Sequence, residues 1–355
     1  MGNTGDTGNT GDSATVRVVI TSPLEDDLVR AIAATDPRLE VVYEGDLVPM
    51  PRYPADHALP PISSLRDHAR WETLLEEAEI LFDFGPPDLA DRLPSWPRLR
   101  WVQATSAGVG QFAARVGLTD SPVVVTTASG VHARPLAEFV LMAMLMFEKG
   151  AFRLAADQRA HHWERYAGQE IAGKLVGVVG GGRIGREVAR VVRALDARVA
   201  GVVRSLDGRR AADLDMDLLL PAGRIDELLP TVDYLVLCLP HTAETYHLLS
   251  AERLGLLRPE AVLINVARGA VVDEEALIAM LRSGRLRGAA LDVFAREPLA
   301  LESPLWDLPN VLVSPHSAST AASENRKIVD LFRDNLRRYL DGRPLRNVLD
   351  KTLLY

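Results

Sequence analysis

The segment that most restricts the fold of this chain is a run of glycines between an apolar strand and an amphipathic helix. Leu175–Val179 has the β-branched pattern of a strand, and Gly180-Gly181-Gly182-Arg183-Ile184-Gly185 follows it directly. The helix predicted next has one apolar face, made by Ile184, Val188, Val191, Val192 and Leu195. A G-x-G-x-x-G sequence between a strand and a helix is typical of loops that bind the pyrophosphate of a dinucleotide.

The glycines of this loop have different predicted tasks. Gly180 permits the tight turn, Gly182 lets the backbone approach the pyrophosphate, and Gly185 lets the helix pack closely on the strand. Arg183 and Ile184 then open the helix, whose free N–H groups favour phosphate. A glycine-rich turn that binds nothing is the alternative, but the strand and helix on either side favour a dinucleotide site.

The end of the next strand bears on which dinucleotide is bound. Proteins that bind NAD usually carry an acidic residue there for the ribose hydroxyls, but the residue 18 positions beyond Gly185 is Val203. Arg204 and Ser205 follow it, and both can bind a 2′-phosphate. We therefore expect NADP to be preferred, with NAD still possible. The alternative is that Arg204 is a solvated charge on a surface turn.

Strands alternate with helices along the chain, which indicates parallel sheets covered by helices. We predict an α/β fold with two Rossmann-like, doubly wound parallel-sheet domains and the cleft between them. Residues 1–14 form a low-complexity N-terminal segment, expected to be disordered. Residues 15–128 form the substrate domain, completed by 317–355, and residues 129–316 form the dinucleotide domain. The predicted strands besides Leu175–Val179 are Val16–Ile20, Leu39–Tyr43, Ile80–Phe84, Leu99–Gln103, Val123–Thr127, Val199–Val203, Tyr234–Leu239, Ala261–Asn265, Ala289–Val293 and Val311–Val313.

Composition excludes several classes of protein. A chain of 355 residues suggests about two domains, and the net charge of −8 argues against a nucleic-acid partner. The longest apolar run, Phe139–Phe147, has nine residues, whereas a membrane span needs roughly 20. Cys238 is the single cysteine, so we expect a cytoplasmic location, no disulfide and no structural metal site.

Three segments that follow predicted strands carry side chains suited to acid–base chemistry. Asn265–Gly269 holds Arg268, Leu291–Pro298 holds Glu297, and Ser314–His316 ends in the histidine. Because the carboxyl ends of parallel strands meet at one edge of a sheet, these side chains are expected to converge. Taken singly, each has a plainer interpretation: a salt bridge for Arg268, an exposed charge for Glu297, and a turn residue for His316.

As a set, these segments resemble the D-isomer-specific 2-hydroxyacid dehydrogenases, in particular the glyoxylate and hydroxypyruvate reductases. The resemblance runs from about residue 100 to the end of the chain. Besides the glycine loop and the three segments above, it rests on Trp101–Gln103, Ser106–Val109, Ala137-Glu138, Leu239-Pro240 with Thr245, and Pro304–Trp306.

The resemblance implies a role for each matching residue. Arg268 binds the substrate carboxylate, and Glu297 supports His316, the general acid/base. The backbone of Ser106, Ala107 and Gly108 also binds the carboxylate. The residues assigned to the cofactor, besides those of the glycine loop and Arg204-Ser205, are Pro240, Thr245, Ala267 and Asp292.

The chain departs from the family pattern at three positions. Gly110 stands where the family often has Asp, and Ser319 stands where it commonly has Gly. The third is Val203, in place of the acidic ribose ligand. Glu297 itself argues against formate dehydrogenases, which carry Gln there. The first two departures bear on substrate preference and leave the three proposed catalytic residues in place.

The implied activity is reduction of a small 2-oxoacid to the D-2-hydroxyacid with hydride from NAD(P)H. His316 would donate the proton while Glu297 orients it and favours its charged form, and Arg268 would fix the carboxylate. Alternatives are a nucleotide-sensing binding protein of the same fold, such as the corepressors that resemble these enzymes, or another hydride-transfer enzyme, such as a phosphonate or alanine dehydrogenase.

A homodimer is the expected assembly. Leu136–Phe147 is apolar on nearly every face of its predicted helix. In the resembling family this helix and the arm after it, here about residues 150–163, pack across a two-fold axis. The alternative is that the helix is buried between the two domains of its own chain.

Overall fold

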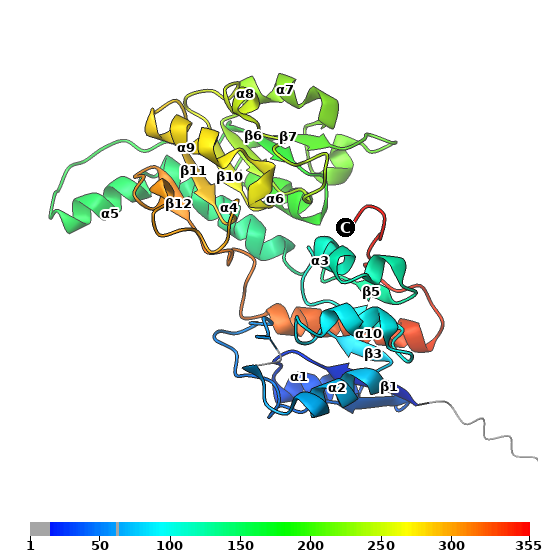
Figure 1. The fold of residues 1–355 in the computed structure, drawn as a ribbon. Helices are drawn as coiled ribbons and strands as arrows, with labels where there is room; N and C mark the ends of the chain where they lie inside the picture. The colour runs from blue at the N-terminus through cyan, green and yellow to red at the C-terminus, as the bar shows by residue number, and fades with distance from the viewer. Residues whose placement is uncertain (1–14, 62–63) are drawn as a thin grey trace, which may run out of the picture. The chain divides into compact units, whose positions relative to one another are not determined.

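The computed structural model describes residues 15–61 and 64–355 (Figure 1). The N-terminal segment predicted to be disordered, 1–14, lies outside the described residues. The chain divides into two compact units. Unit 1 runs to Ala128 and resumes at Ala322–Tyr355, and unit 2 is Ser129–Ala321. The return to unit 1 therefore comes at residue 322 instead of 317. Residues 317 and 318 stay with unit 2 because their backbone N–H groups donate to Asp292.

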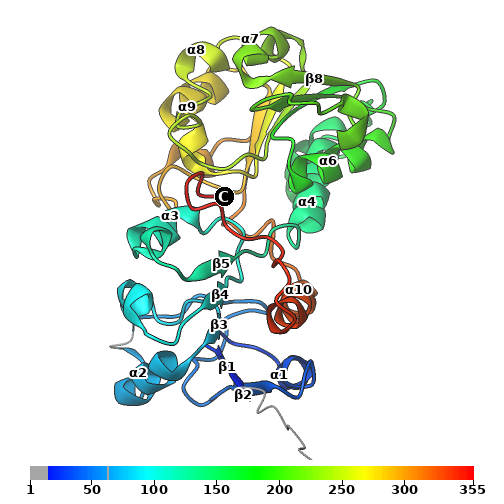
Figure 2. The same ribbon diagram turned by 90° about the vertical axis from the view of Figure 1, so that its right-hand side faces the viewer.

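Unit 1 is built on a parallel sheet of five strands in the order β2-β1-β3-β4-β5. Figure 2 shows α2 and α3 on one face of the sheet and α1 and α10 on the other. The strands are β1 (Val16–Ile20), β2 (Leu39–Val42), β3 (Ile80–Phe82), β4 (Trp101–Gln103) and β5 (Val124–Thr126). The helices are α1 (Asp26–Ala33), α2 (His68–Glu77), α3 (Gly110–Arg115) and α10 (Glu324–Leu340).

Unit 2 has a parallel sheet of seven strands in the order β12-β11-β10-β9-β6-β7-β8. The strands are β6 (Leu175–Val179), β7 (Arg198–Val203), β8 (Leu218–Pro221), β9 (Tyr234–Leu237), β10 (Val262–Asn265), β11 (Gly288–Leu291) and β12 (Val311–Val313). The helices are α4 (Ala133–Glu148), α5 (Ala151–Arg159), α6 (Arg183–Arg193), α7 (Ile225–Leu228), α8 (Ala251–Leu254) and α9 (Glu274–Arg282). The predicted class, α/β with two parallel-sheet units, is confirmed, and β8 is a strand that the sequence did not predict.

The order of strands in unit 2 creates a switch point beside β6. After β6 the chain adds β7 and β8 on one side, and then crosses to place β9 on the other. In open parallel sheets, ligands bind at the carboxyl ends of the strands where the order reverses. The glycine loop follows β6, so it lies at this switch point.

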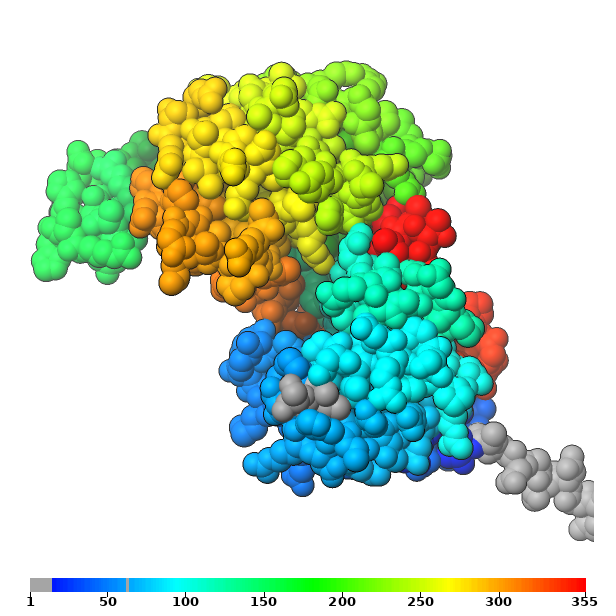
Figure 3. All heavy atoms as spheres, in the orientation of Figure 1, coloured from blue at the N-terminus to red at the C-terminus, as the bar shows by residue number. Residues whose placement is uncertain are grey.

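Helices α4 and α5 expose apolar side chains. The buried face of α4 includes Leu136, Val140 and Met144, and the helix packs against α6. Its outer face leaves Met142 and Leu145 exposed. No residue of α5 is buried, and Figure 3 shows this helix standing out from the body of its unit. In the part of the chain that the structure describes, no helix is long and apolar enough to cross a membrane.

Candidate active site

Three glycines of the loop after β6 are enclosed by backbone or by a neighbouring side chain. Gly180 has φ of 120°, and a Cβ there would lie 2.5 Å from the carbonyl oxygen of Cys238. A Cβ on Gly185 would lie 1.9 Å from the Gly180 oxygen, so the start of α6 rests on the turn. A Cβ on Gly181 would lie 2.3 Å from Val203 Cγ1.

Gly182 has open space around it, because nothing lies within 4 Å of where its Cβ would be. It is the N-cap of α6, which begins at Arg183. Arg183 Nη1 donates to the Ser129 oxygen at 3.0 Å, and the Ile184 side chain is half-buried. The loop thus combines tightly packed glycines with one open backbone position at a helix start, which suits a pyrophosphate group.

The carboxyl ends of five neighbouring strands are level with one another. The register pairs Val179 of β6 with Leu237 of β9, Leu237 with Asn265 of β10, Asn265 with Leu291 of β11, and Leu291 with Val313 of β12. The segments that carry Arg268, Glu297 and His316 follow β10, β11 and β12. They therefore leave the same edge of the sheet as the glycine loop.

His316 and Glu297 form a direct pair. Nδ1 of His316 lies 2.7 Å from Oε2 of Glu297, and the backbone N–H of Phe294 donates to Oε1 of the same carboxylate at 3.1 Å. Both side chains are partly open, with 43% of His316 and 37% of Glu297 exposed. Since Nδ1 faces the carboxylate, the geometry leaves Nε2 of His316 as the ring atom for a ligand.

The backbone of His316 has φ of 55°, in the left-handed region that residues other than glycine seldom occupy. Asp292 holds this turn. Its Oδ1 accepts hydrogen bonds from Ser314 Oγ at 2.6 Å and from the N–H groups of Ser317 and Ala318 at 2.9 and 3.0 Å. A strained conformation supported on both sides is common at functional sites.

Arg268 is placed by two contacts of its neighbours. Asn265 accepts from the Ala267 N–H at 3.0 Å and donates through Nδ2 to the Arg268 oxygen at 3.2 Å, which fixes the loop after β10. A Cβ on Gly269 would lie 1.9 Å from the Phe294 carbonyl carbon. This backbone contact brings the loop of Arg268 against the segment that carries Glu297.

The surroundings shift the pKa values of Arg268, Asp292 and Glu297 in different ways. Burial lowers the pKa of Arg268, although Glu297 and Asp292 oppose the shift. Burial also raises the pKa of Asp292, and its hydrogen bonds and the His316 charge oppose this only in part. For Glu297, partial burial acts upward, but hydrogen bonds from His316 and Phe294 and the charges of His316 and Arg268 outweigh it, so its pKa is lowered.

The end of β7 lies beside the glycine loop, because Val179 pairs with Val202. Val203 is 3% exposed, with its side chain directed at Gly181. Arg204 is exposed and Ser205 is half-buried on the turn that follows. Val203 thus occupies the position where a ribose-binding acid is usual, and an arginine and a hydroxyl follow it.

The remaining cofactor assignments fall at the same edge of the sheet. Thr245 Oγ1 donates to the Pro240 oxygen at 2.8 Å and accepts from the Thr242 N–H at 2.8 Å, which closes the loop after β9. Ala267 is buried in the loop after β10. Asp292, as described above, supports the turn of His316, a task that the sequence did not predict for it.

Ser106, Ala107 and Gly108 belong to unit 1, in the loop after β4. Ser106 and Gly108 are exposed. The N–H of Ala128 donates to the Ser106 oxygen at 3.1 Å, and Thr105 Oγ1 donates to Asp83 Oδ2 at 3.0 Å. These bonds anchor one end of the loop. The three residues are thus placed separately from Arg268, Glu297 and His316 of unit 2.

Comparison of the chain with known proteins identifies its family. The model of the D-isomer specific 2-hydroxyacid dehydrogenase NAD-binding domain matches residues 141–318. The glyoxylate/hydroxypyruvate reductase B of Pectobacterium carotovorum is 34% identical over 285 residues, which cover 79% of this chain and 88% of the relative. The chain belongs to the D-isomer-specific 2-hydroxyacid dehydrogenase family.

Other members of the family show how far the similarity reaches. The D-3-phosphoglycerate dehydrogenase of Mycobacterium leprae is 39% identical over 246 residues, or 68% of this chain, but the match spans only 45% of that relative's length. The solved NADPH-dependent glyoxylate/hydroxypyruvate reductase of Sinorhizobium meliloti, in complex with NADP and sulfate, is 28% identical, with a TM-score of 0.77. That alignment covers 96% of this chain and all of the solved chain.

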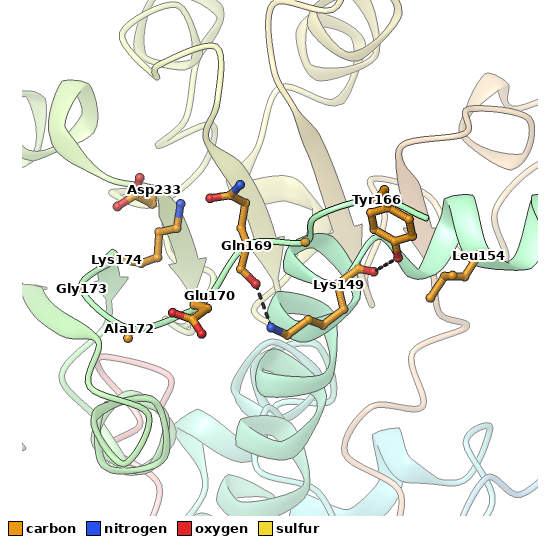
Figure 4. Close-up of a pocket in the computed structure, with 10 residues that line it drawn as sticks. Lys149, Leu154, Tyr166, Gln169, Glu170, Ala172, Gly173, Lys174 and Asp233 are labelled. Atoms are coloured by element: carbon orange, nitrogen blue, oxygen red, sulfur yellow. Dashed lines mark hydrogen bonds between the residues drawn. The ribbon is translucent and has the colours of Figure 1, made fainter. Parts of the chain in front are cut away.

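A hollow of about 900 Å³ in unit 2 lies away from the site of this dehydrogenase-family chain. Its lining includes Lys174 and Asp233, which precede β6 and β9, so it opens at the amino ends of the strands. Figure 4 shows two bonds that close part of it, from Lys149 Nζ to the Gln169 oxygen and from the Tyr166 hydroxyl to the Lys149 oxygen. Because parallel sheets bind their ligands at the carboxyl ends, this hollow is not the candidate site.

Sequence reasoning missed the residues that hold the site together. Asn265 and Ser314 were recognised only as parts of motifs, whereas the structure shows them holding Arg268 and Asp292. Glu274 was missed altogether; its Oε2 accepts from the Ala295 N–H at 2.9 Å, beside Glu297. A polar residue at the very end of a buried strand, such as Asn265, is the signal that could have identified the first of these.

Proposed function

We propose that this chain reduces a small 2-oxoacid to the D-2-hydroxyacid with a reduced nicotinamide dinucleotide. The observation that carries the proposal is the 2.7 Å contact between His316 Nδ1 and Glu297 Oε2, on the sheet edge that also holds the glycine loop. Unit 2 is proposed as the dinucleotide domain and unit 1 as the substrate domain.

Reduction of the oxoacid requires a proton donor, and this role is proposed for His316. Nε2 of His316 holds a proton and gives it to the carbonyl oxygen as negative charge builds there. Glu297 orients the ring and stabilises the imidazolium, and its lowered pKa keeps the carboxylate ionised for this task. When bound, the nicotinamide supplies the hydride that goes to the keto carbon.

The carboxylate of the substrate is the second requirement. Arg268 offers a planar guanidinium that can bind a carboxylate through two parallel hydrogen bonds. The backbone of Ser106–Gly108 is proposed to donate to the same carboxylate. Fixing the acid at this end aligns the keto group with His316, which is where positioning contributes most to rate.

The dinucleotide fits the residues of unit 2. The open backbone at Gly182 and the start of α6 would hold the pyrophosphate, with Pro240, Thr245, Ala267 and Asp292 proposed around the nicotinamide half. Arg204 and Ser205 would bind a 2′-phosphate, and Val203 offers no acceptor to ribose hydroxyls. We therefore propose NADPH as the preferred cofactor, with NADH accepted less well.

The test is a panel of glyoxylate, hydroxypyruvate, pyruvate and bulkier 2-oxoacids, each assayed with NADPH and with NADH. Turnover of at least one oxoacid to the D-hydroxyacid is expected; absence of turnover across the panel would favour a nucleotide-sensing protein. Arg204→Ala should lower kcat/KM for NADPH by about one to two decades and leave NADH use unchanged. Equal efficiency with both cofactors in the unmodified chain would reject the NADP preference.

A homodimer through unit 2 is proposed from the surfaces of α4 and α5. Met142 is 42% exposed, Leu154 is 49% exposed and Trp163 is 93% exposed, and a second copy of this chain would cover these apolar side chains. Sedimentation at micromolar concentration should show a dimer, and Trp163→Ser with Leu154→Ser should weaken it. A monomer in the unmodified chain would reject the proposal. The cytoplasmic location stays a prediction of the sequence.

A further inference from the structure

The end of the chain packs against the residue that follows the substrate loop. A Cβ on Gly110 would lie 1.9 Å from the carbonyl oxygen of Leu354 and 2.8 Å from its Cα. All of these contacts are with backbone, which cannot rotate aside as a side chain can. Gly110 is the first residue of α3, and Figures 1 and 2 both show the end of the chain beside this helix.

The segment 347–355, here called the tail, is bonded along β5 before it reaches Gly110. Asn347 accepts from the Thr127 N–H at 2.9 Å, and the Leu349 N–H donates to the Val125 oxygen at 2.8 Å. Lys351 Nζ donates to the Ser121 oxygen at 2.6 Å. The tail is therefore an ordered part of unit 1, hydrogen-bonded to the edge strand of its sheet.

A tight turn then directs the tail to Gly110. Asp350 Oδ1 accepts from the N–H groups of Thr352 and Leu353, both at 2.9 Å, and its backbone oxygen accepts from the Leu354 N–H at 2.7 Å. Leu354 has φ of 63°, in the left-handed region, which a leucine occupies only where its surroundings hold it. The turn presents the Leu354 carbonyl to the start of α3.

The contact explains one departure from the family pattern. Gly110 lies in a helix, where alanine has the higher intrinsic propensity, so the helix itself gives no reason for glycine. The backbone of Leu354 gives that reason, because any side chain at position 110 would occupy the same space. The Asp that the family often carries here is excluded by the tail.

We propose that the tail is a positioning element for substrate binding, acting through Gly110 on the loop Ser106–Gly108. The proposal rests on the proposed function, in which this loop binds the substrate carboxylate. Asp83 and Ala128 anchor the loop at its beginning, and the tail fixes the residue two positions after its end. With both ends held, the N–H groups of the loop keep one orientation, which reduces the cost of binding the carboxylate.

The test is a double-mutant cycle between Gly110→Ala and a variant that ends at Leu349. Each change alone should raise KM for the 2-oxoacid about tenfold, with kcat and KM for NADPH little changed. In the variant that ends at Leu349, adding Gly110→Ala should alter KM by less than about twofold, because the backbone it would strike is gone. The melting temperature should fall with Gly110→Ala in the full chain and stay level or rise in the shortened one.

Two controls separate the contact from general effects. Gly223→Ala is a matched change, since nothing lies within 4 Å of its Cβ position, and it should leave KM unchanged in both backgrounds. Lys351→Ala removes the bond to Ser121 without touching Gly110, and it should raise KM less than the truncation does. Hydrogen exchange of the backbone from 104 to 112 gives a readout that does not depend on turnover.

The outcomes separate this inference from the proposed function. Faster exchange at 104–112 after removal of 350–355, with non-additive effects on KM, supports the tail as a positioning element. Effects on KM that multiply independently, or exchange at 104–112 unchanged by the truncation, would overturn it. If the unmodified chain reduces no oxoacid, the proposed function fails, and the exchange and melting measurements still decide whether the tail holds the loop. Should Gly110→Ala fail to fold at full length, the shortened chain must restore folding.

Discussion

Each unit holds a histidine near a carboxylate, and the two arrangements differ in how much water reaches the acid. In unit 2, Glu297 pairs with His316 at 2.7 Å, and more than a third of each side chain is exposed. In unit 1, His57 is hydrogen-bonded through Nδ1 to Ser22 and is close enough for its charge to act on Asp83. Among the described residues, His57 Nε2 is buried and has no hydrogen-bond partner.

The difference in burial moves the two carboxyl pKa values in opposite directions. Burial raises the pKa of Asp83, and His57 and the Thr105 hydrogen bond offset this only in part. For Glu297, the His316 bond and the neighbouring charges overcome a smaller desolvation cost, so the pKa is lowered. A nearby histidine therefore does not by itself make a proton-transfer pair, because desolvation can outweigh the pairing. Asp83 anchors Thr105 through its hydrogen bond, and Glu297 with His316 is the pair proposed for proton transfer.

Removing each histidine in turn should give the largest difference between the two units. His316→Ala should lower kcat for 2-oxoacid reduction by about 10²–10⁴-fold, because the proton donor is lost, while cofactor affinity is kept. His57→Ala should leave kcat near that of the unmodified chain and lower the melting temperature, because Ser22 loses a buried partner. Steady-state kinetics and cofactor titration measure both. Near-normal kcat in His316→Ala would contradict its role as the proton donor. A fall in kcat of about 10²-fold or more in His57→Ala would contradict the structural role given to His57.

Removing the cation beside the exposed pair should have the next largest effect. Arg268→Ala is expected to raise KM for the oxoacid and lower kcat, with kcat/KM falling about 10²-fold, because the carboxylate clamp also positions the carbonyl. The charge of Arg268 helps to lower the pKa of Glu297, so the acid limb of the pH profile should move to higher pH. Arg268→Lys is the control that keeps the charge without the planar guanidinium. Unchanged kinetics in Arg268→Ala would remove this residue from the proposed carboxylate clamp.

The smallest expected effect is on how the stability of the fold changes with pH, because Glu297 and Asp83 should act in opposite directions. The lowered pKa of Glu297 means that its ionisation favours the folded state, so the unmodified chain should gain stability over Glu297→Gln as pH rises toward about 4.3. The raised pKa of Asp83 means the reverse: the unmodified chain should lose stability relative to Asp83→Asn as pH rises above about 3.9. Calorimetry of the three proteins over a pH series measures both differences. Slopes of the same sign would show that burial does not separate the two acids.

The sequence predicted the fold well, because its strands are short apolar runs between clear helical patterns. It missed β8, Leu218–Pro221, since a strand of four residues that ends in proline gives little signal. It also placed the return of the chain to unit 1 five residues early, at 317 instead of 322. Hydrogen bonds join residues 317 and 318 to Asp292 of unit 2, and pattern analysis cannot show such bonds.

The site was predictable to the extent that it follows from strand order. Arg268, Glu297 and His316 each come shortly after a strand, and parallel strands place their following loops at one edge. What holds these loops together was not predictable, because the contact of Gly269 with the Phe294 backbone joins residues 25 positions apart in sequence. The contact between Gly110 and Leu354 spans most of the chain, and no local pattern encodes it.

The packing of Val203 on Gly181 has a consequence for how coenzyme preference can evolve in this chain. An Asp at 203, the simplest route to NAD selectivity, would place a carboxylate beside the backbone of Gly181, in a site where Val203 is only 3% exposed. That charge would be desolvated before any ribose reached it. Val203→Asp alone is therefore expected to destabilise the fold of unit 2. A change of coenzyme preference at this position therefore carries a stability cost that comes from one buried apolar contact.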